Sequence, residues 1–148
     1  MTELRILGLL CVLWLGGLVA CSEPEENITG STADGLFAVR MKAEKNWVRA
    51  GHDLPIRVTL ESLTGTFPES RQEHIVFRAN NGELSASSLS FNFAAPDDSL
   101  GITGDTSQSG WIIFTADGYA SSKLQGEIIA LFDDLQFTYK VRFVDRNQ

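Results

Sequence analysis

Residues 128–143 read IIALFDDLQFTYKVRF and decide the fold. In the second half of this stretch, an apolar or aromatic side chain stands at every other position: Phe137, Tyr139, Val141 and Phe143. A period of two predicts a β-strand with one buried face. Phe132 ends a similar stripe upstream, and the acidic pair Asp133-Asp134 between the two stripes is typical of a turn. The stretch therefore predicts an antiparallel hairpin.

The same period recurs through the chain from Leu36 onward. Further apolar stripes lie at residues 37–41, 54–60, 75–79, 89–93, 111–115 and 124–132. Clusters of Gly, Asn, Asp and Pro separate them, and no segment has a sustained helical period. Pro55 suggests an edge strand or the beginning of a strand. About seven short antiparallel strands, each with one buried face, predict an all-β fold of two packed sheets.

One strand is apolar on both faces. Trp111 and Ile113 alternate with Ile112 and Phe114. Such a strand is either central and covered on both sides or part of a contact surface, and both alternatives stay open. The residues of a possible partner surface are Trp47, Trp111, Ile112 and Phe114.

Composition and charge limit the classes of partner. The chain has 148 residues, 43% of them apolar, which is enough for one domain with its own core. The net charge is −7, and no basic cluster occurs. These features argue against nucleic acid and against docking on anionic lipid by charge. Membrane contact would therefore need a covalent anchor.

The first 20 residues predict a cleaved signal peptide. After Arg5, an apolar run extends from Ile6 to Ala20 and includes Cys11. Fifteen helical residues span ~22 Å. A bilayer core of about 30 Å needs a longer helix, so the run suits a signal peptide better than a membrane span.

The run ends in Leu18-Val19-Ala20-Cys21, which resembles the lipobox of bacterial lipoproteins. The resemblance implies cleavage before Cys21 and lipid attachment to its thiol, with palmitate-type acyl chains anchoring the protein. This covalent lipid is the only added group expected. Ser22 at the next position favours the outer membrane over the inner one. The predicted location is therefore the bacterial cell envelope, lipid-anchored and in the outer membrane.

The residues after the predicted cleavage site have the composition of a tether. Residues 22–35 read SEPEENITGSTADG and contain almost no apolar residue. Such a segment predicts a flexible, solvated linker. The expected organisation is a signal peptide at 1–20, a lipidated N-terminus with a linker at 21–35, and one β-sandwich domain at 36–148.

Two further runs resemble bacterial immunoglobulin-like domains of the invasin and intimin type. These are residues 75–85, IVFRANNGELS, and residues 106–115, TSQSGWIIFT. The resemblance implies an immunoglobulin-like antiparallel β-sandwich that acts as a spacer or adhesive module. Ser85 and Gly110 are farther apart than in that family, which makes residues 86–109 a candidate functional loop region. Tyr119, in a stretch similar to the tyrosine corner of such domains, is expected to be structural.

No catalytic motif appears in the sequence. His52 and His74 lack the close spacing of zinc ligands, and neither a nucleophile elbow nor a phosphate loop occurs. No catalytic residue and no metal site are therefore assigned, and a hydrolase is the least favoured class. Acidic turn residues leave a Ca²⁺ site open as an alternative: Asp97, Asp98, Asp105, Asp117, Asp133 and Asp134.

The sequence thus favours a membrane-anchored, non-catalytic interaction, spacer or adhesion module whose partner is an envelope protein or glycan. The alternative is a ligand-binding lipoprotein that recognises a glycan or Ca²⁺ through loops at one end of the sandwich.

Overall fold

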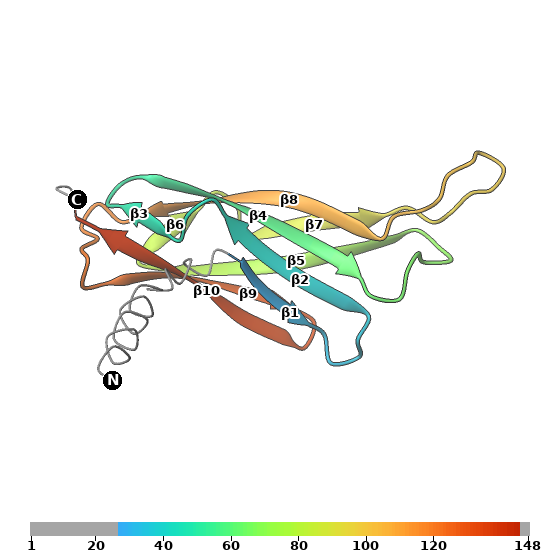
Figure 1. Cartoon of the computed structure of the whole chain (residues 1–148), viewed down its shortest axis with the longest axis horizontal. Coiled ribbons are helices and arrows are strands. Elements are labelled where there is room, and N and C mark those ends of the chain that lie inside the picture. Colours follow the sequence, from blue (N-terminus) through green and yellow to red (C-terminus); the bar gives the residue numbers. More distant parts are fainter. Residues whose placement is uncertain (1–26, 146–148) are drawn as a thin grey trace, which may run out of the picture.

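The computed structural model describes residues 27–145, which form ten strands and no helix (Figure 1). The predicted all-β class is confirmed, whereas the expected count of about seven strands is too low. The predicted signal peptide, Cys21 and the first part of the predicted linker lie outside the described residues. The strands are β1 (Asn27–Ser31), β2 (Phe37–Ala43), β3 (Trp47–Arg49), β4 (Asp53–Ser62), β5 (Arg71–Asn80), β6 (Gly82–Leu84), β7 (Ser88–Phe93), β8 (Ser107–Ala116), β9 (Gln125–Phe132) and β10 (Leu135–Val144).

Two five-stranded sheets pack face to face. The order is β1-β2-β4-β8-β6 in the first sheet and β3-β10-β9-β5-β7 in the second. All neighbours are antiparallel except β3 and β10, which are parallel. The chain passes between the two sheets repeatedly, first between β2 and β3 and again at each later connection up to β8–β9. Asn81 joins β5 of the second sheet to β6 of the first with a positive φ of 58°, a conformation that Asn tolerates better than most residues.

The hairpin predicted at the end of the chain is present. Phe132 and Leu135 face each other across β9 and β10, and Asp133 takes a positive φ of 49° in the turn. Tyr139, Val141 and Phe143 are buried, as their alternation predicted.

The core fills the space between the two sheets. At one end, four phenylalanine rings form an aromatic cluster with centroid distances of 5.4 to 5.8 Å: Phe37, Phe67, Phe93 and Phe132. Toward the other end, Phe114 of β8 and Phe143 of β10 stack with centroids 6.4 Å apart. Phe37 with Phe93 and Phe132, and Phe114 with Phe143, join the two sheets, while Phe67 reaches the cluster from the β4–β5 loop.

The linker prediction was wrong for its second half. Residues 27–31 form β1, which extends the first sheet by pairing with β2 in register from Asn27–Lys42 to Ser31–Ala38. The next residue, Thr32, is buried, and its hydroxyl accepts a hydrogen bond from the Phe37 N–H at 3.1 Å. The sandwich therefore begins before Leu36.

Two further expectations meet different outcomes. Pro55 is the third residue of β4 and lies beyond the last β2–β4 pair, Ala43–Ile56, so its missing N–H costs no bond in that ladder. This agrees with the predicted beginning of a strand. Tyr119 is 97% exposed, so the structural role expected for it is wrong.

Candidate functional site

The two faces of β8 have opposite environments. Ile112 and Phe114 have no exposed surface and lie in the core. Trp111 and Ile113 point the other way, to the outside of the first sheet, and are 60% and 38% exposed. Large apolar side chains that stay exposed next to each other on a sheet are typical of a contact surface.

Neighbouring strands complete this surface. Pro55 of β4 is the register partner of Ile113, and Arg57 of β4 is the register partner of Trp111. Lys42 of β2 lies next to Arg57 in the same cross-strand row. We call the five side chains Lys42, Pro55, Arg57, Trp111 and Ile113 the Trp111 face.

The charges of the Trp111 face are unevenly placed. Arg57 donates a hydrogen bond to Ser109 Oγ at 3.3 Å, and no carboxylate of the described residues forms an ion pair with Arg57 or Lys42. Asp53 and Glu83 lie beyond Ile113, where both are register partners of Thr115. The face therefore has an apolar centre, a cationic side and an acidic side.

The residues predicted as a partner surface do not come together. Ile112 and Phe114 are buried and leave that surface, because their register partners Ile56 and Leu54 are core residues. Trp47 lies on the other sheet, at the edge strand β3, with Lys45 Nζ 4.1 Å from its ring centroid. Only Trp111 remains on the Trp111 face.

Residues 94–106, which we call the arm, extend beyond the sandwich between β7 and β8 (Figure 1). They belong to the region predicted as a functional loop. Two hydrogen bonds join Ala94 and Asp105 at the base of the arm. The Asp105 N–H donates to the Ala94 carbonyl at 3.0 Å, and the Asp105 carboxylate accepts from the Ala94 N–H at 2.9 Å. Ser70 Oγ accepts from the Ala95 N–H at 3.1 Å. The base is therefore fixed to the sandwich.

The tip of the arm, residues 97–102, is a tight turn. Asp97 and Ile102 exchange two backbone hydrogen bonds at 2.8 and 2.9 Å, and Gly101 takes a φ of 67°. The Ser99 hydroxyl donates to the Asp97 carboxylate at 2.6 Å and holds the pKa of Asp97 below its ordinary value. Leu100 is 72% exposed at this tip. An ordered tip thus presents an apolar side chain beside the acidic side chains of Asp97 and Asp98.

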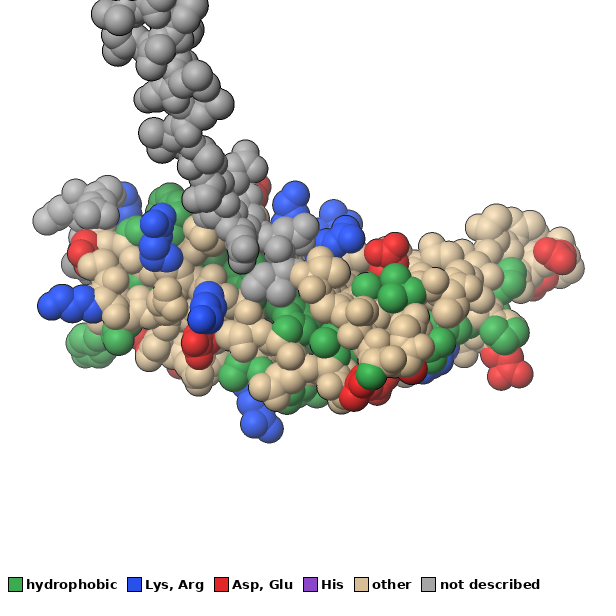
Figure 2. Space-filling model, turned by 60° about the horizontal axis from the view of Figure 1, so that its bottom comes forward, with side chains coloured by type: hydrophobic (Ala, Val, Ile, Leu, Met, Phe, Trp, Pro, Cys, Tyr) green, Lys and Arg blue, Asp and Glu red, His purple; other side chains and the backbone are tan. Residues whose placement is uncertain are grey.

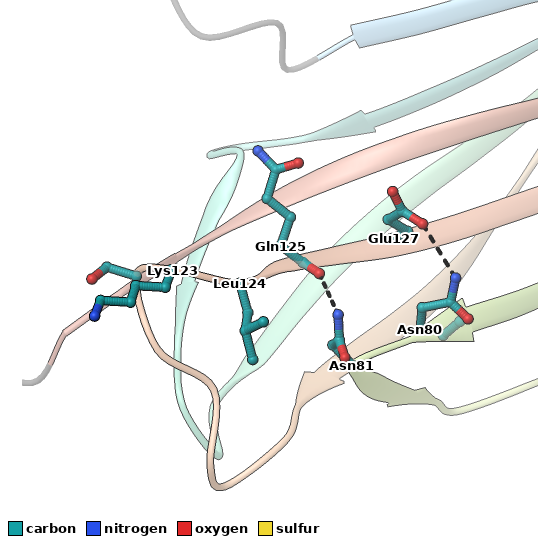
Figure 3. A pocket seen from close by; sticks show the side chains of 8 residues that line it. Asn80, Asn81, Lys123, Leu124, Gln125 and Glu127 are labelled. Carbon is teal, nitrogen blue, oxygen red and sulfur yellow. Dashed lines mark hydrogen bonds between the residues drawn. The ribbon is translucent and has the colours of Figure 1, made fainter.

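A shallow depression of about 830 Å³ lies at the end of the sandwich opposite the arm, where β5 ends and β9 begins (Figures 1 and 3). Asn81 Nδ2 donates to the Gln125 carbonyl at 2.7 Å, and Asn80 Nδ2 donates to Glu127 at 3.2 Å. Its lining is mostly polar and includes no aromatic ring. Ligand sites are usually concave and largely apolar. A glycan could enter this depression, but the depression lacks the exposed apolar side chains that Trp111 and Ile113 give the Trp111 face. The Trp111 face is therefore the better candidate for a binding surface.

The residues suggested for Ca²⁺ do not converge. Asp97, Asp98 and Asp105 belong to the arm, whereas Asp117 follows β8 at its other end and Asp133 lies in the β9–β10 turn. Among residues 27–145, no group of three His, Cys, Asp or Glu side chains could hold a metal ion. His52 and His74 are both exposed and lie apart in the chain, His52 in the connection between β3 and β4 and His74 in β5.

Comparison with known proteins adds no relative: no protein-family model, curated protein or solved structure matches the chain. Within the part of the chain that the structure describes, no helix is long and apolar enough to cross a membrane.

Proposed function

We propose that this chain is a lipid-anchored lipoprotein of the bacterial envelope whose immunoglobulin-like sandwich is a non-catalytic interaction module. The Trp111 face is its contact surface. The observation that carries this proposal is the exposure of Trp111 and Ile113 next to each other on the outer side of a regular sheet. Leaving both apolar side chains in water costs free energy that a bound partner would recover.

The strand order supports the immunoglobulin-like part. In such domains, strands A, B, E and D form one sheet and strands C, F and G form the other. The orders β2-β4-β8-β6 and β10-β9-β5 follow A-B-E-D and G-F-C, with the seven strands in chain order. On this reading, β1, β3 and β7 are additions to the seven-strand pattern. The added strand β7 and the arm then occupy the region where Ser85 and Gly110 are unusually far apart.

The anchor is tested by comparing two cysteine variants of the full chain in bacteria. We expect Cys21→Ala to abolish incorporation of labelled fatty acid, roughly tenfold or more below the unmodified chain, because the thiol that carries the lipid is lost. The chain should also remain at precursor size. Cys11→Ala is the matched control and should be labelled and processed normally. Labelling of Cys21→Ala at the normal level would remove the lipoprotein assignment.

The contact surface is tested with a photo-crosslinking residue at one of two positions. Position 113 lies on the Trp111 face, and position 76 lies on the outer side of the other sheet, where Val76 is 43% exposed. We expect defined adducts from position 113 in intact cells, roughly tenfold more abundant than those from position 76, since only the first lies in a contact surface. Equal adducts from the two positions would contradict the assignment of the face.

A further inference from the structure

The chain has a second exposed apolar feature, the arm tip, and its charge is opposite to that of the cationic side of the Trp111 face. Leu100 and Ile102 are 72% and 45% exposed at the tip, and Asp97 and Asp98 lie beside them. The arm contains no Lys or Arg. Figure 2 shows acidic side chains at the arm end of the molecule and most of the Lys and Arg side chains on the other half.

The acidic character of the tip selects among partners. A carboxylate that enters a lipid bilayer loses its hydration, so Asp97 and Asp98 disfavour insertion of Leu100 into a membrane. A protein surface with an apolar centre and cations at its side would instead satisfy both parts of the tip. Arg57 and Lys42 lie beside Trp111 without an ion-pair partner among the described residues, so the Trp111 face has this composition.

The tip cannot reach the Trp111 face of its own chain. The arm leaves the sandwich at the beginning of β8 and runs away from it, whereas Trp111 and Ile113 lie farther along β8 over the body of the molecule (Figure 1). The backbone bonds between Ala94 and Asp105 and between Asp97 and Ile102 keep the two sides of the arm together, and the Ala95 N–H bond to Ser70 Oγ ties its base to the sandwich. Contact between the two surfaces therefore requires two molecules.

We propose that the arm tip of one copy of this chain docks on the Trp111 face of a second copy, with Leu100 against Trp111 and Ile113 and with Asp98 facing Arg57. This inference rests on the proposed function and names the partner of that face. The two surfaces in the contact differ, so the contact is heterologous. In a docked pair, one copy still has a free arm and the other still has a free Trp111 face. Further copies can therefore add at both ends, and assembly gives either a closed ring or a linear array.

The contact is small, because a single turn covers part of one sheet. Contacts of this size belong to the weak and transient class. A lipid anchor on each copy would compensate by confining the molecules to one surface, which raises their effective concentration. The net charge of −7 opposes association, but physiological salt screens that repulsion beyond about 8 Å and leaves the close Asp98–Arg57 attraction.

The test is disulfide cross-linking between two tagged copies of the full chain that are co-expressed in cells. One copy carries Leu100→Cys and the other carries Ile113→Cys. We expect a cross-linked species that contains both tags, about tenfold more abundant than with Val76→Cys in place of Ile113→Cys. Val76 is the matched control, since it is similarly exposed on the outer side of the other sheet. A chain that carries both Leu100→Cys and Ile113→Cys should give a ladder of larger species.

A charge exchange separates specific docking from random collision. Arg57→Glu on the face copy should lower the yield of the cross-linked species by roughly three- to tenfold, and Asp98→Lys on the arm copy should do the same. With both changes present on opposite copies, the yield should recover. Asp98 suits this exchange because the side-chain hydrogen bonds that shape the tip are accepted by the Asp97 carboxylate, whereas Asp98 contributes its backbone carbonyl. Leu100–Ile113 cross-linking at the level of the Val76 control, or a yield unchanged by Arg57→Glu, would overturn the inference.

Failure of this inference is distinguishable from failure of the proposed function. If photo-crosslinks from position 113 join the chain to a different protein, the Trp111 face remains a contact surface and the second copy is the wrong partner. If position 113 gives no more adducts than position 76, the contact surface itself is wrong.

Discussion

Phe114→Ala is expected to lower the free energy of unfolding by about 3–5 kcal/mol, the range for removing a buried phenylalanine ring. The ring has no exposed surface and stacks on Phe143 of the opposite sheet. Gly82 and Gly126 lie against its edges and have no side chain that could move into the space left behind. The cavity should therefore stay open, which favours the upper part of the range. Urea unfolding followed by tryptophan fluorescence gives the value.

The neighbouring residue provides the control for this prediction. Ile113 belongs to the same strand but faces outward and is 38% exposed, so Ile113→Ala should lower the free energy of unfolding by no more than about 1 kcal/mol. The difference between the two variants reports which face of β8 is the core. Equal losses of stability would mean that the assignment of the two faces is wrong.

The sequence predicted the alternation of β8 but not which of its faces is buried. Ile112 with Phe114 and Trp111 with Ile113 are equally apolar sets, so the pattern within the strand leaves the question open. The register with β4 decides it: Ile112 pairs with Ile56, whereas Trp111 pairs with Arg57. Cross-strand partners thus carry information that a single strand lacks. Once the β4–β8 pairing was known, Ile113 and Arg57 could have been added to the candidate surface.

The missed strand β1 shows a second limit of sequence patterns. Its sequence NITGS resembles a linker, because an edge strand can be held mainly by backbone hydrogen bonds to its neighbour. Gly30 in this strand also lies close to Leu135, since a Cβ at that position would meet Leu135 at 3.0 Å. Neither the ladder nor this close approach leaves a hydrophobic pattern in the sequence. The arm is similar: polar turn residues predicted a loop, but not an ordered hairpin with Leu100 at its tip.

Gly126→Ala is expected to destabilise the fold by about 1–3 kcal/mol through overpacking. A Cβ at position 126 would lie 2.6 Å from Phe114 Cζ and 3.1 Å from Phe143 Cε1, and both rings are fully enclosed by the core. Replacing glycine by alanine without strain normally stabilises a protein by about 0.4–1 kcal/mol through the unfolded chain. The φ of Gly126 is not positive, so any loss of stability here reports the contact with the rings and not backbone strain.

Two companion variants make the overpacking prediction specific. Gly118→Ala is the matched control: nothing lies within 4 Å of a Cβ at that position, so its effect should stay within about 0.5 kcal/mol. Phe114→Leu removes the ring that clashes, so the double variant Gly126→Ala, Phe114→Leu should lose less stability than the two single losses added together. A coupling of about 1 kcal/mol or more between these touching positions is expected. Additive losses would show that the alanine methyl group is accommodated by backbone movement, and that Phe114 does not set the requirement for glycine at position 126.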